Sequence, residues 1–310
     1  MKQLVILSGK GGTGKTSVTA AFAHLASSDS VQNLDAPNWG VPVRAVLADA
    51  DVDAANLELV LAPNIVERHD FWGGKVAIIN QDLCAGCGTC EAVCRFDAVH
   101  ETYGVYQVDP IACDGCAACV YQCPEDAIKM QDEIAGEWFR SESHYGTLFH
   151  AALKPGGENS GKLVTLVKQN ARLLALDEGY ELVLVDGPPG IGCPVISAAS
   201  GADLALIVAE PTAAGVHDMR RVLSTTAHFG VRSLVCINKA DIYPDGADEI
   251  ENFCQEEGIT LAGRIPFDLT VTHAMVQGQT VTAFDPEAPA SQALRKIWKV
   301  VLEAITGDGS

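Results

Sequence analysis

Residues 3–18 read QLVILSGKGGTGKTSV, in which a short apolar run stops at a glycine-rich loop and then continues with helical spacing. Glycines in such a loop let backbone N–H groups turn inward around phosphates, while Lys15 reaches the β and γ oxygens and Thr16 offers its hydroxyl to Mg²⁺. The stretch therefore predicts a strand, a phosphate-binding loop and a helix. The predicted nucleotide contacts of this stretch are Gly11, Gly12, Thr13, Gly14, Lys15, Thr16 and Ser17.

Four more apolar runs predict buried strands, at residues 43–51, 181–187, 202–210 and 232–239. Runs without polar alternation suit a parallel sheet that is covered on both faces. Polar, turn-rich residues 27–40 predict a surface loop.

Near the end of the chain, an apolar stripe with i, i+3, i+4, i+7 spacing predicts a last helix that packs on the sheet. The stripe consists of Leu294, Ile297, Trp298, Val301, Leu302 and Ile305. A membrane-targeting helix has a similar stripe, but the polar face of this segment is only mildly basic, which favours packing.

The charge balance limits the classes of function. The 310 residues carry 40 acidic and 21 basic side chains, a formal charge of −19, which repels nucleic-acid phosphates and anionic lipid headgroups. We therefore expect neither nucleic-acid nor membrane binding. No apolar run approaches the roughly 18 residues that span a membrane, and the first residues lack the features of a secretory signal. A cytoplasmic location is expected.

Eight of the 11 cysteines fall in two repeats, CAGCGTCEAVC at 84–94 and CDGCAACVYQC at 113–123. This spacing supplies three ligands of an Fe₄S₄ cluster from one loop, and in two-cluster ferredoxins the fourth cysteine of each run serves the other cluster. Zinc is the competing metal because it also takes four thiolates, but tandem runs with crossed fourth cysteines are typical of ferredoxins. The sequence predicts two [4Fe-4S] clusters, one on Cys84, Cys87, Cys90 and Cys123 and the other on Cys113, Cys116, Cys119 and Cys94.

A carboxylate stands at the end of another apolar strand. In LVLVDGPPGIGCPV, residues 182–195, Asp186 closes the apolar run. A carboxylate at that position would bind Mg²⁺ through water. Gly190 lies in the stiff but open loop that follows, next to the expected γ-phosphate.

The form Lys-Gly-Gly-x-Gly-Lys-Thr at residues 10–16 resembles the deviant Walker A loop of the MinD, ParA and Mrp ATPases and of the nitrogenase iron protein. The resemblance implies that Lys10 crosses a nucleotide-sandwich dimer to the phosphates of the partner. DADVDAAN, residues 49–56, is similar to switch I of that group. This similarity implies that Asp51 orients or deprotonates the attacking water and that Asp49 helps to hold Mg²⁺.

The motif NKAD, residues 238–241, is ambiguous, because Asn-Lys-x-Asp is also the guanine-recognition motif of many GTPases. In the MinD-like group an asparagine at this strand end contacts adenine. The resemblance therefore makes Asn238, together with Lys239, a candidate nucleotide contact. The deviant loop favours ATP, and GTP remains the alternative.

Between residues 64 and 133 the apolar runs shorten, and 12 acidic residues stand against four basic ones. We predict a ferredoxin-like domain at 64–133, inserted into a discontinuous P-loop ATPase domain at 1–63 and 134–310. The fold class is α/β, a mostly parallel sheet with a small inserted α+β domain of the bacterial ferredoxin type. Both motifs together resemble the MinD-superfamily ATPases that contain an inserted ferredoxin domain.

The insert leaves the chain about a dozen residues after Asp51, so its root is the segment expected to move when ATP is bound or hydrolysed. We predict a nucleotide-dependent homodimer whose ATP hydrolysis gates low-potential electron transfer to a redox partner that the sequence does not identify. An ATP-dependent carrier or assembly factor that loads a cluster or metallocofactor onto an apo-client protein is the alternative. A ParA-like positioning or regulatory switch with structural clusters is a third class.

Three cysteines lie outside the repeats. Cys193 stands at the offset from Asp186 at which the nitrogenase iron protein has a cluster ligand in switch II, so the resemblance makes Cys193 a candidate redox or cluster-linked thiol. A structural role in shaping the loop before Pro194 is the alternative. Cys236, in a strand, and Cys254, in an amphipathic segment, are predicted to be buried as small apolar residues.

Overall fold

The computed structural model describes residues 1–27, 43–154 and 160–307. Except for Ser27, the loop predicted at 27–40 lies outside these residues. Contacts between Cα atoms divide the chain into unit 1, Met1–Arg68, Trp138–Ala151 and Gly161–Ser310, and unit 2, His69–Glu137 and Ala152–Ser160. Unit 2 contains both cysteine repeats and overlaps the predicted insert, whose bounds stay a prediction.

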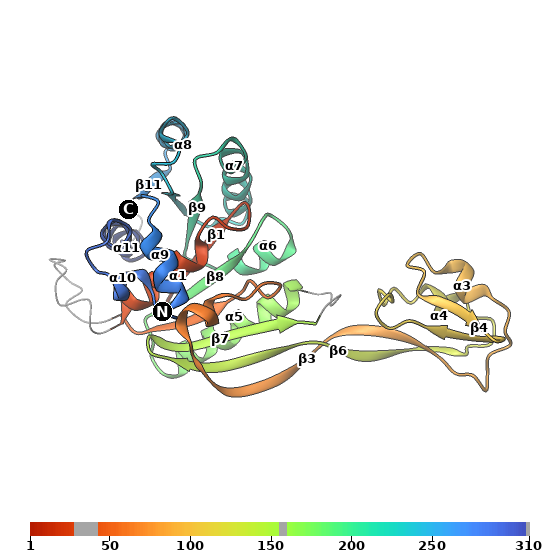
Figure 1. The fold of residues 1–310 in the computed structure, drawn as a ribbon. Coiled ribbons are helices and arrows are strands. Elements are labelled where there is room, and N and C mark those ends of the chain that lie inside the picture. Colours follow the sequence, from red (N-terminus) through yellow and green to blue (C-terminus); the bar gives the residue numbers. More distant parts are fainter. Residues whose placement is uncertain (28–42, 155–159, 308–310) are drawn as a thin grey trace. The chain divides into compact units, whose positions relative to one another are not determined.

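Nine strands form one sheet in the order β11-β10-β9-β1-β8-β2-β7-β6-β3 (Figure 1). They are β1 (Lys2–Ser8), β2 (Ala45–Asp49), β3 (Asn64–Ile79), β6 (Ile128–Ser143), β7 (Gly146–Leu153), β8 (Leu182–Pro189), β9 (Leu204–Ala209), β10 (Ser233–Asn238) and β11 (Thr260–Ile265). Parallel pairing runs from β1 through β9 and β10 to β11 on one side, and through β8 and β2 to β7 on the other. All five predicted strands are present, and the mostly parallel α/β sheet is confirmed.

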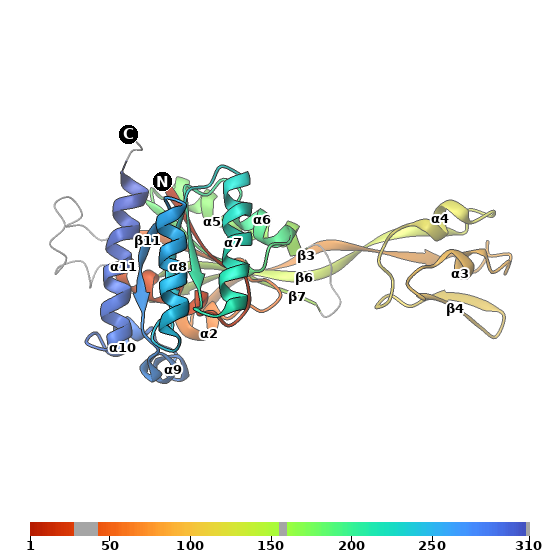
Figure 2. The ribbon, with the colours of Figure 1, turned by 90° about the horizontal axis from the view of Figure 1, so that it is seen from above.

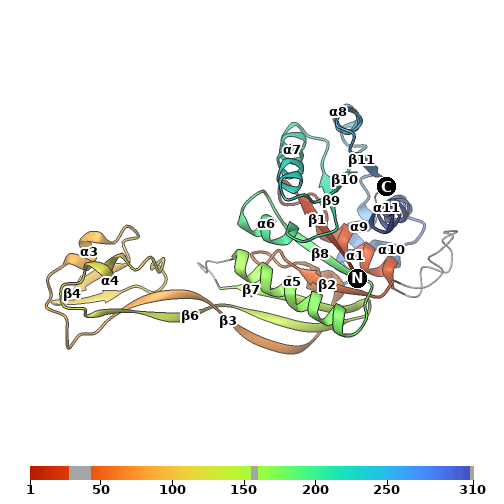
Figure 3. The ribbon, with the colours of Figure 1, turned by 180° about the vertical axis from the view of Figure 1, so that it is seen from behind.

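Helices cover both faces of the sheet in unit 1. α1 (Lys15–Ala26), α10 (Val281–Phe284) and α11 (Pro289–Thr306) lie on one face, and α5 (Ser160–Asp177), α6 (Cys193–Ala199), α7 (Ala213–His228) and α8 (Pro244–Glu256) lie on the other (Figure 1 and Figure 3). Figure 2 shows α7 and α8 side by side.

The apolar strands are explained by burial on both faces. Leu4 and Ile6 of β1 join the core beneath α1 and α11, and Val5 and Leu7, which point to the other face, are equally buried. The predicted stripe of the last helix is buried at all six positions, so packing, not membrane binding, accounts for it. Its Trp298 packs against Phe22 of α1, with ring centroids 4.8 Å apart.

The carboxyl ends of the parallel strands meet at one edge of the sheet, where the register decides which side chains become neighbours. Asp49 at the end of β2 lies opposite Asp186 of β8, and Ile6 of β1 lies opposite Asp186 on the other side. The glycine-rich loop that follows β1 therefore lies beside the carboxylates of Asp49 and Asp186. In open α/β sheets, ligands bind at this edge, where neighbouring strands diverge in chain order.

β6 and β7 form a hairpin that the apolar runs do not predict. β6 and β7 are neighbours in the sheet and are joined by a tight turn, in which Ser143 Oγ donates to Gly146 O at 2.7 Å; a connection this short makes the two strands antiparallel. Gly146 has a φ of 130°, and a Cβ there would meet the carbonyl oxygen of Ala45. The stretch GEWFRSESHYG, residues 136–146, is therefore the end of β6 and the hairpin turn.

Unit 2 contains one small motif twice, 29 residues apart. Its elements include α3 (Thr89–Val93), β4 (Val99–Thr102), β5 (Val105–Val108) and α4 (Ala118–Gln122), and β4 and β5 are antiparallel (Figure 3). Asn80 N donates to Ala127 O and Asp109 N donates to Ala98 O, both at 2.7 Å. A residue before each repeat thus pairs with a residue after the other repeat. This pairing brings the last cysteine of one repeat toward the first cysteines of the other.

Candidate nucleotide site and cysteine sites

The loop between β1 and α1 depends on Gly14, which has a φ of 92° directly before the helix. A Cβ at Gly14 would overlap the side-chain amide of Asn238. This amide donates from Nδ2 to Thr13 O at 2.7 Å and so fastens the loop to the end of β10. Replacing Gly14 by any other residue would therefore strain the backbone and break this attachment.

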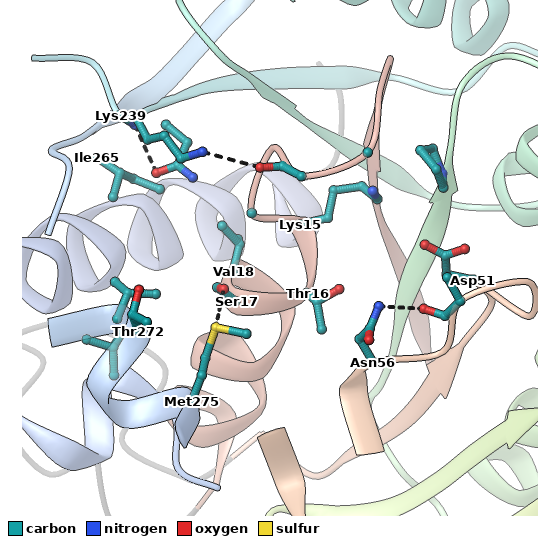
Figure 4. Close-up of a pocket in the computed structure, with 18 of the residues that line it drawn as sticks. Lys15, Thr16, Ser17, Val18, Asp51, Asn56, Lys239, Ile265, Thr272 and Met275 are labelled. Atoms are coloured by element: carbon teal, nitrogen blue, oxygen red, sulfur yellow. Dashed lines mark hydrogen bonds between the residues drawn. The ribbon is translucent and has the colours of Figure 1, made fainter. Parts of the chain in front are cut away.

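A cavity of about 700 Å³ opens beside the loop. Figure 4 shows Lys15, Thr16 and Asp51 at one end and Ile265, Thr272 and Met275 at the other. One polar and one apolar end suit the phosphates and the base of a nucleotide. The predicted residues that line the cavity are Gly11, Gly12, Gly14, Lys15, Thr16, Ser17, Asp51, Asn238 and Lys239.

Asp186 is almost fully buried and reaches the polar end of the cavity through its contact with Thr16. Its Oδ2 accepts from Thr16 Oγ1 at 2.7 Å, and its Oδ1 accepts from Thr19 Oγ1 at 2.9 Å. Burial raises the pKa of Asp186, and hydrogen bonds from both threonines and the charge of Lys15 oppose this. A hydroxyl and a carboxylate in contact are oxygen ligands of the kind that Mg²⁺ prefers, so these residues fit the ion.

Asp49 has a different environment from the one expected. It is fully buried, and its two oxygens accept backbone hydrogen bonds from Asp51 N at 3.1 Å and Leu57 N at 3.0 Å. Burial and the neighbouring Asp186 raise its pKa well above the usual value. Asp49 therefore organises the backbone after β2, and its direct role in holding Mg²⁺ stays a prediction.

Asp51 is only partly buried and faces the cavity opposite Lys15 (Figure 4). Burial, opposed by Lys15 and assisted by Asp186, raises the pKa of Asp51 to about 6. A carboxylate of this basicity suits a group that accepts a proton near neutral pH. The geometry is compatible with the predicted role of Asp51 toward the attacking water.

Lys10 and Lys239 share one carboxylate. Glu210, directly after β9, accepts from Lys10 Nζ at 2.7 Å on one oxygen and from Lys239 Nζ at 2.5 Å on the other. Lys239 Nζ also donates to Gly12 O at 3.3 Å. Burial raises the pKa of Glu210, but the hydrogen bonds from both lysines outweigh it and lower the pKa. Lys10 is thus held within its own chain, and its predicted crossing to a partner stays a prediction.

The two candidate base contacts of the motif at 238–241 lie in different places. Asp241 Oδ1, the group that would pair with guanine, accepts from Phe267 N at 2.6 Å. Asn238 instead lines the cavity, with Oδ1 accepting from Lys239 N at 3.0 Å. One oxygen of Asp241 therefore holds the loop after β11, and the choice between adenine and guanine stays a prediction.

The end of β8 borders the same cavity through Pro188 and Pro189, and the start of α6 borders it through Pro194. Gly190, with a φ of 93°, donates from N to Ser8 O at 2.9 Å and so attaches the segment between β8 and α6 to the end of β1. Cys193 is the first residue of α6 and is exposed. Its functional role stays a prediction.

Sequence reasoning missed two polar residues of this site, Thr19 and Glu210. Thr19 lies one helical turn after Thr16, and that i, i+3 spacing of hydroxyls on a helix after a phosphate loop was an available signal. Glu210 closes the apolar run 202–210, as Asp186 closes its own run, and an acid at a parallel strand end was likewise an available signal.

In unit 2, one small cavity is lined by four thiols from both repeats. They are Cys84, Cys87 and Cys90 of the first repeat and Cys123 of the second. This is the first predicted ligand set, with its crossed fourth member. Cys90 is buried, whereas Cys87 is exposed.

The second predicted ligand set consists of Cys113, Cys116 and Cys119 of the second repeat and Cys94 of the first. Cys119 is buried as Cys90 is, and the nearby thiols of Cys113 and Cys116 contribute, after burial, to raising its pKa. Cys94 Sγ accepts from Ala98 N at 3.4 Å, and Cys123 Sγ accepts from Ala127 N at 3.3 Å. Backbone amides that donate to sulfur stabilise thiolates and tune a bound cluster.

These observations test the fit of the insert to Fe₄S₄ clusters. Loops with positive φ at Gly86, Gly88, Gly115 and Ala117 bring backbone close to the thiols. In the described ranges, no three His, Cys, Asp or Glu side chains are arranged around a single metal ion. The fit rests instead on the four-thiol cavity, the crossed pairing and the amide donors, all of which suit a cluster.

The remaining thiols give a testable prediction. Burial raises the pKa of Cys236 to about 12 and that of Cys254 to about 11, so at pH 7.5 fewer than about one in a thousand of either is a thiolate. Anaerobic labelling of the cluster-loaded protein with iodoacetamide, read by mass spectrometry, should therefore modify Cys193 alone. A Cys193→Ser control should take up no label, and early modification of Cys236 or Cys254 would contradict this assignment.

The chain is similar to several known proteins. Residues 77–100 match the family model described as 4Fe-4S binding domain. The chain is 30% identical to Uncharacterized protein MJ0578 of Methanocaldococcus jannaschii, over 98% of this chain and 97% of that protein. It is 25% identical to the Iron-sulfur cluster carrier protein of Pyrococcus horikoshii, over 42% of this chain and 48% of that protein.

The fold has counterparts among solved structures. The septum site-determining protein MinD of Pyrococcus horikoshii, solved with Mg-ADP, superposes with a TM-score of 0.55 at 18% identity, covering 97% of this chain and 95% of that one. Over the described residues, no helix has the length and apolar character needed to cross a membrane. The chain shares its family with MJ0578 over nearly its whole length and belongs to the MinD/ParA-like P-loop ATPases that carry an inserted 4Fe-4S ferredoxin domain.

Proposed function

We propose that this protein uses ATP binding and hydrolysis to gate electron transfer through the clusters of its insert. The observation that carries the proposal is a short link in unit 1. Asp49 Oδ2 accepts from Leu57 N, the first residue of α2 (Leu57–Leu61), and β3 begins soon afterwards, at Asn64. β3 leads in sequence to the first cysteine repeat, so the strand that enters the insert begins soon after a helix whose Leu59 lines the nucleotide cavity.

The returning strand, β6, is linked to the same short helix through β7. His150 of β7 is buried, with Nδ1 3.0 Å from Glu58 Oε2 of α2 and Nε2 2.9 Å from Ser141 Oγ of β6. Burial lowers the pKa of His150 to about 4. α2 is therefore in contact with the β6–β7 hairpin and directly precedes β3, and a shift of α2 would reach both strands.

Changes at the nucleotide site would cause the shift of α2. Lys15 and Thr16 would hold the phosphates and Mg²⁺, and Asp51 would accept a proton from the attacking water. Binding or loss of the γ-phosphate would change the charge that faces Asp51, and the segment 49–57 would shift in response. The clusters, when bound, supply one-electron transfer at low potential. Two copies of the chain would enclose the nucleotide, with Lys10 completing the partner's site.

The test is a redox titration of the cluster-loaded protein under anaerobic conditions. The reduction potential in Mg²⁺ with a non-hydrolysable ATP analogue should differ from that in Mg-ADP by about 60 mV or more, a tenfold change for one electron. Lys15→Ala, which should not hold the nucleotide, is the control and should show no shift. Equal potentials in both nucleotides would contradict gating. Cys193→Ser tests whether that thiol contributes to the shift.

Cluster delivery is the second candidate, and the likeness to the Iron-sulfur cluster carrier protein over part of the chain favours it. A carrier should pass a labile cluster to an apo-protein in an ATP-dependent step, whereas an electron-transfer protein should keep its clusters through repeated reduction. A positioning switch should do neither. Incubation with an excess of apo-ferredoxin, followed by iron analysis of the separated proteins, distinguishes the three.

A further inference from the structure

Glu210 holds two cations with one carboxylate. Its side chain is 12% exposed, and each of its oxygens takes one lysine, Lys10 at 2.7 Å and Lys239 at 2.5 Å. The group of three carries a net charge of +1, next to a loop built for phosphate. A nearly buried carboxylate is costly to leave without a counter-ion, so at least one of the two lysines must stay.

The two lysines differ in how firmly they are held. Lys239 is anchored at three points, since its Nζ also donates to Gly12 O and its backbone N donates to Asn238 Oδ1. The two side chains are about equally exposed, at 34% for Lys10 and 33% for Lys239, but Lys10 belongs to the loop itself, and among the described residues its ammonium group has only Glu210 as an acceptor. Lys239 is therefore the permanent partner of Glu210. When Lys10 leaves, the Glu210 carboxylate still has Lys239 as its counter-ion.

We propose that Glu210 is a latch that keeps Lys10 on its own chain until the phosphates of a nucleotide bound to a second copy draw it away. The inference rests on the dimerising ATPase of the proposed function. Glu210 and those phosphates compete for one ammonium group. The strength of the latch then sets the ATP concentration at which two copies associate, and it suppresses hydrolysis below that concentration.

The test is Glu210→Gln, which keeps the size of the side chain and removes its charge. In an Asp51→Ala background, which holds ATP without turnover, sedimentation velocity gives the ATP concentration for half-maximal dimer. This concentration should fall about fivefold, as expected for loss of one ion pair. Glu210→Asp, which keeps the charge but reaches less far, should lie between the parent and Glu210→Gln. A merely structural role would lower the melting temperature without favouring the dimer.

Asp218→Asn is the matched control, because Asp218 packs against Gly9 of the same loop and its loss changes the local charge by the same amount. It should leave the ATP concentration for half-maximal dimer unchanged. The latch would be overturned if the ATP concentration for half-maximal dimer fell equally in Asp218→Asn, or did not fall in Glu210→Gln. Absence of ATP-dependent dimers in the parent would overturn the latch and the dimer together. Gating is measured separately by the cluster potential, so its failure is distinguishable.

Discussion

Replacing Asp51 by alanine is expected to slow ATP hydrolysis by about 10²- to 10⁴-fold, the usual contribution of a general base. Asp51 faces the cavity opposite Lys15, and its backbone N donates to Asp49 Oδ1 at 3.1 Å, which orients the segment. ATP should still bind, because the loop, Lys15 and Thr16 are untouched. The measurement is single-turnover hydrolysis at saturating ATP together with equilibrium binding of a fluorescent ATP analogue.

Two variants make this prediction specific. Asp53→Ala removes a second carboxylate that lines the same cavity, so it should reproduce any general effect of charge without the large loss of rate. Lys15→Ala should instead weaken ATP binding itself, since it removes the cation that contacts the phosphates. An Asp51→Ala protein that hydrolyses ATP at the parent rate would exclude Asp51 as the group that activates water.

The second large effect concerns which cysteines share a cluster. Removing Cys84 and Cys123 together should destroy one cluster and leave the other, because both thiols line one cavity. Anaerobic iron analysis should fall from about eight atoms per chain to about four. Cys84→Ser with Cys94→Ser should destroy both clusters and leave almost no iron, since the two thiols belong to different sets.

The two double variants carry the same number of substitutions, so a general loss of stability cannot separate them. Paramagnetic resonance of the reduced proteins adds a second readout, because spin coupling between two clusters disappears when one is lost. If Cys84→Ser with Cys94→Ser retained four irons, each repeat would hold its own cluster and the crossed assignment would be wrong. Zinc in place of iron after anaerobic purification would contradict the cluster prediction as a whole.

Several features could be predicted because they depend on residues close together in the chain. The glycines and Lys15 of residues 9–16 shape a phosphate site with little help from elsewhere. The x2, x2, x3 cysteine spacing defines a cluster loop in the same way. Apolar runs predicted β1, β2, β8, β9 and β10, since strands buried on both faces contain no polar alternation.

Such short-range patterns did not predict the hairpin of β6 and β7. Its strands contain Arg140, Glu142 and His150, so neither shows a continuous apolar run. His150 is buried only because Glu58 and Ser141 satisfy its two nitrogens. Those partners come from α2 and β6, and no local sequence signal predicts their meeting.

The sequence by itself determined the two kinds of chemistry that this protein carries, a nucleotide site and a pair of cysteine sites, since both depend on short-range spacing. Only the tertiary structure decided how the charges around the nucleotide are arranged. The register of β2 on β8 buries Asp49 beside Asp186, where it holds the backbone after β2. The placement of β9 beside β1 brings Glu210 to Lys10, two hundred residues away in the chain. Such contacts depend on strand order and burial, which long-range packing fixes and local spacing does not.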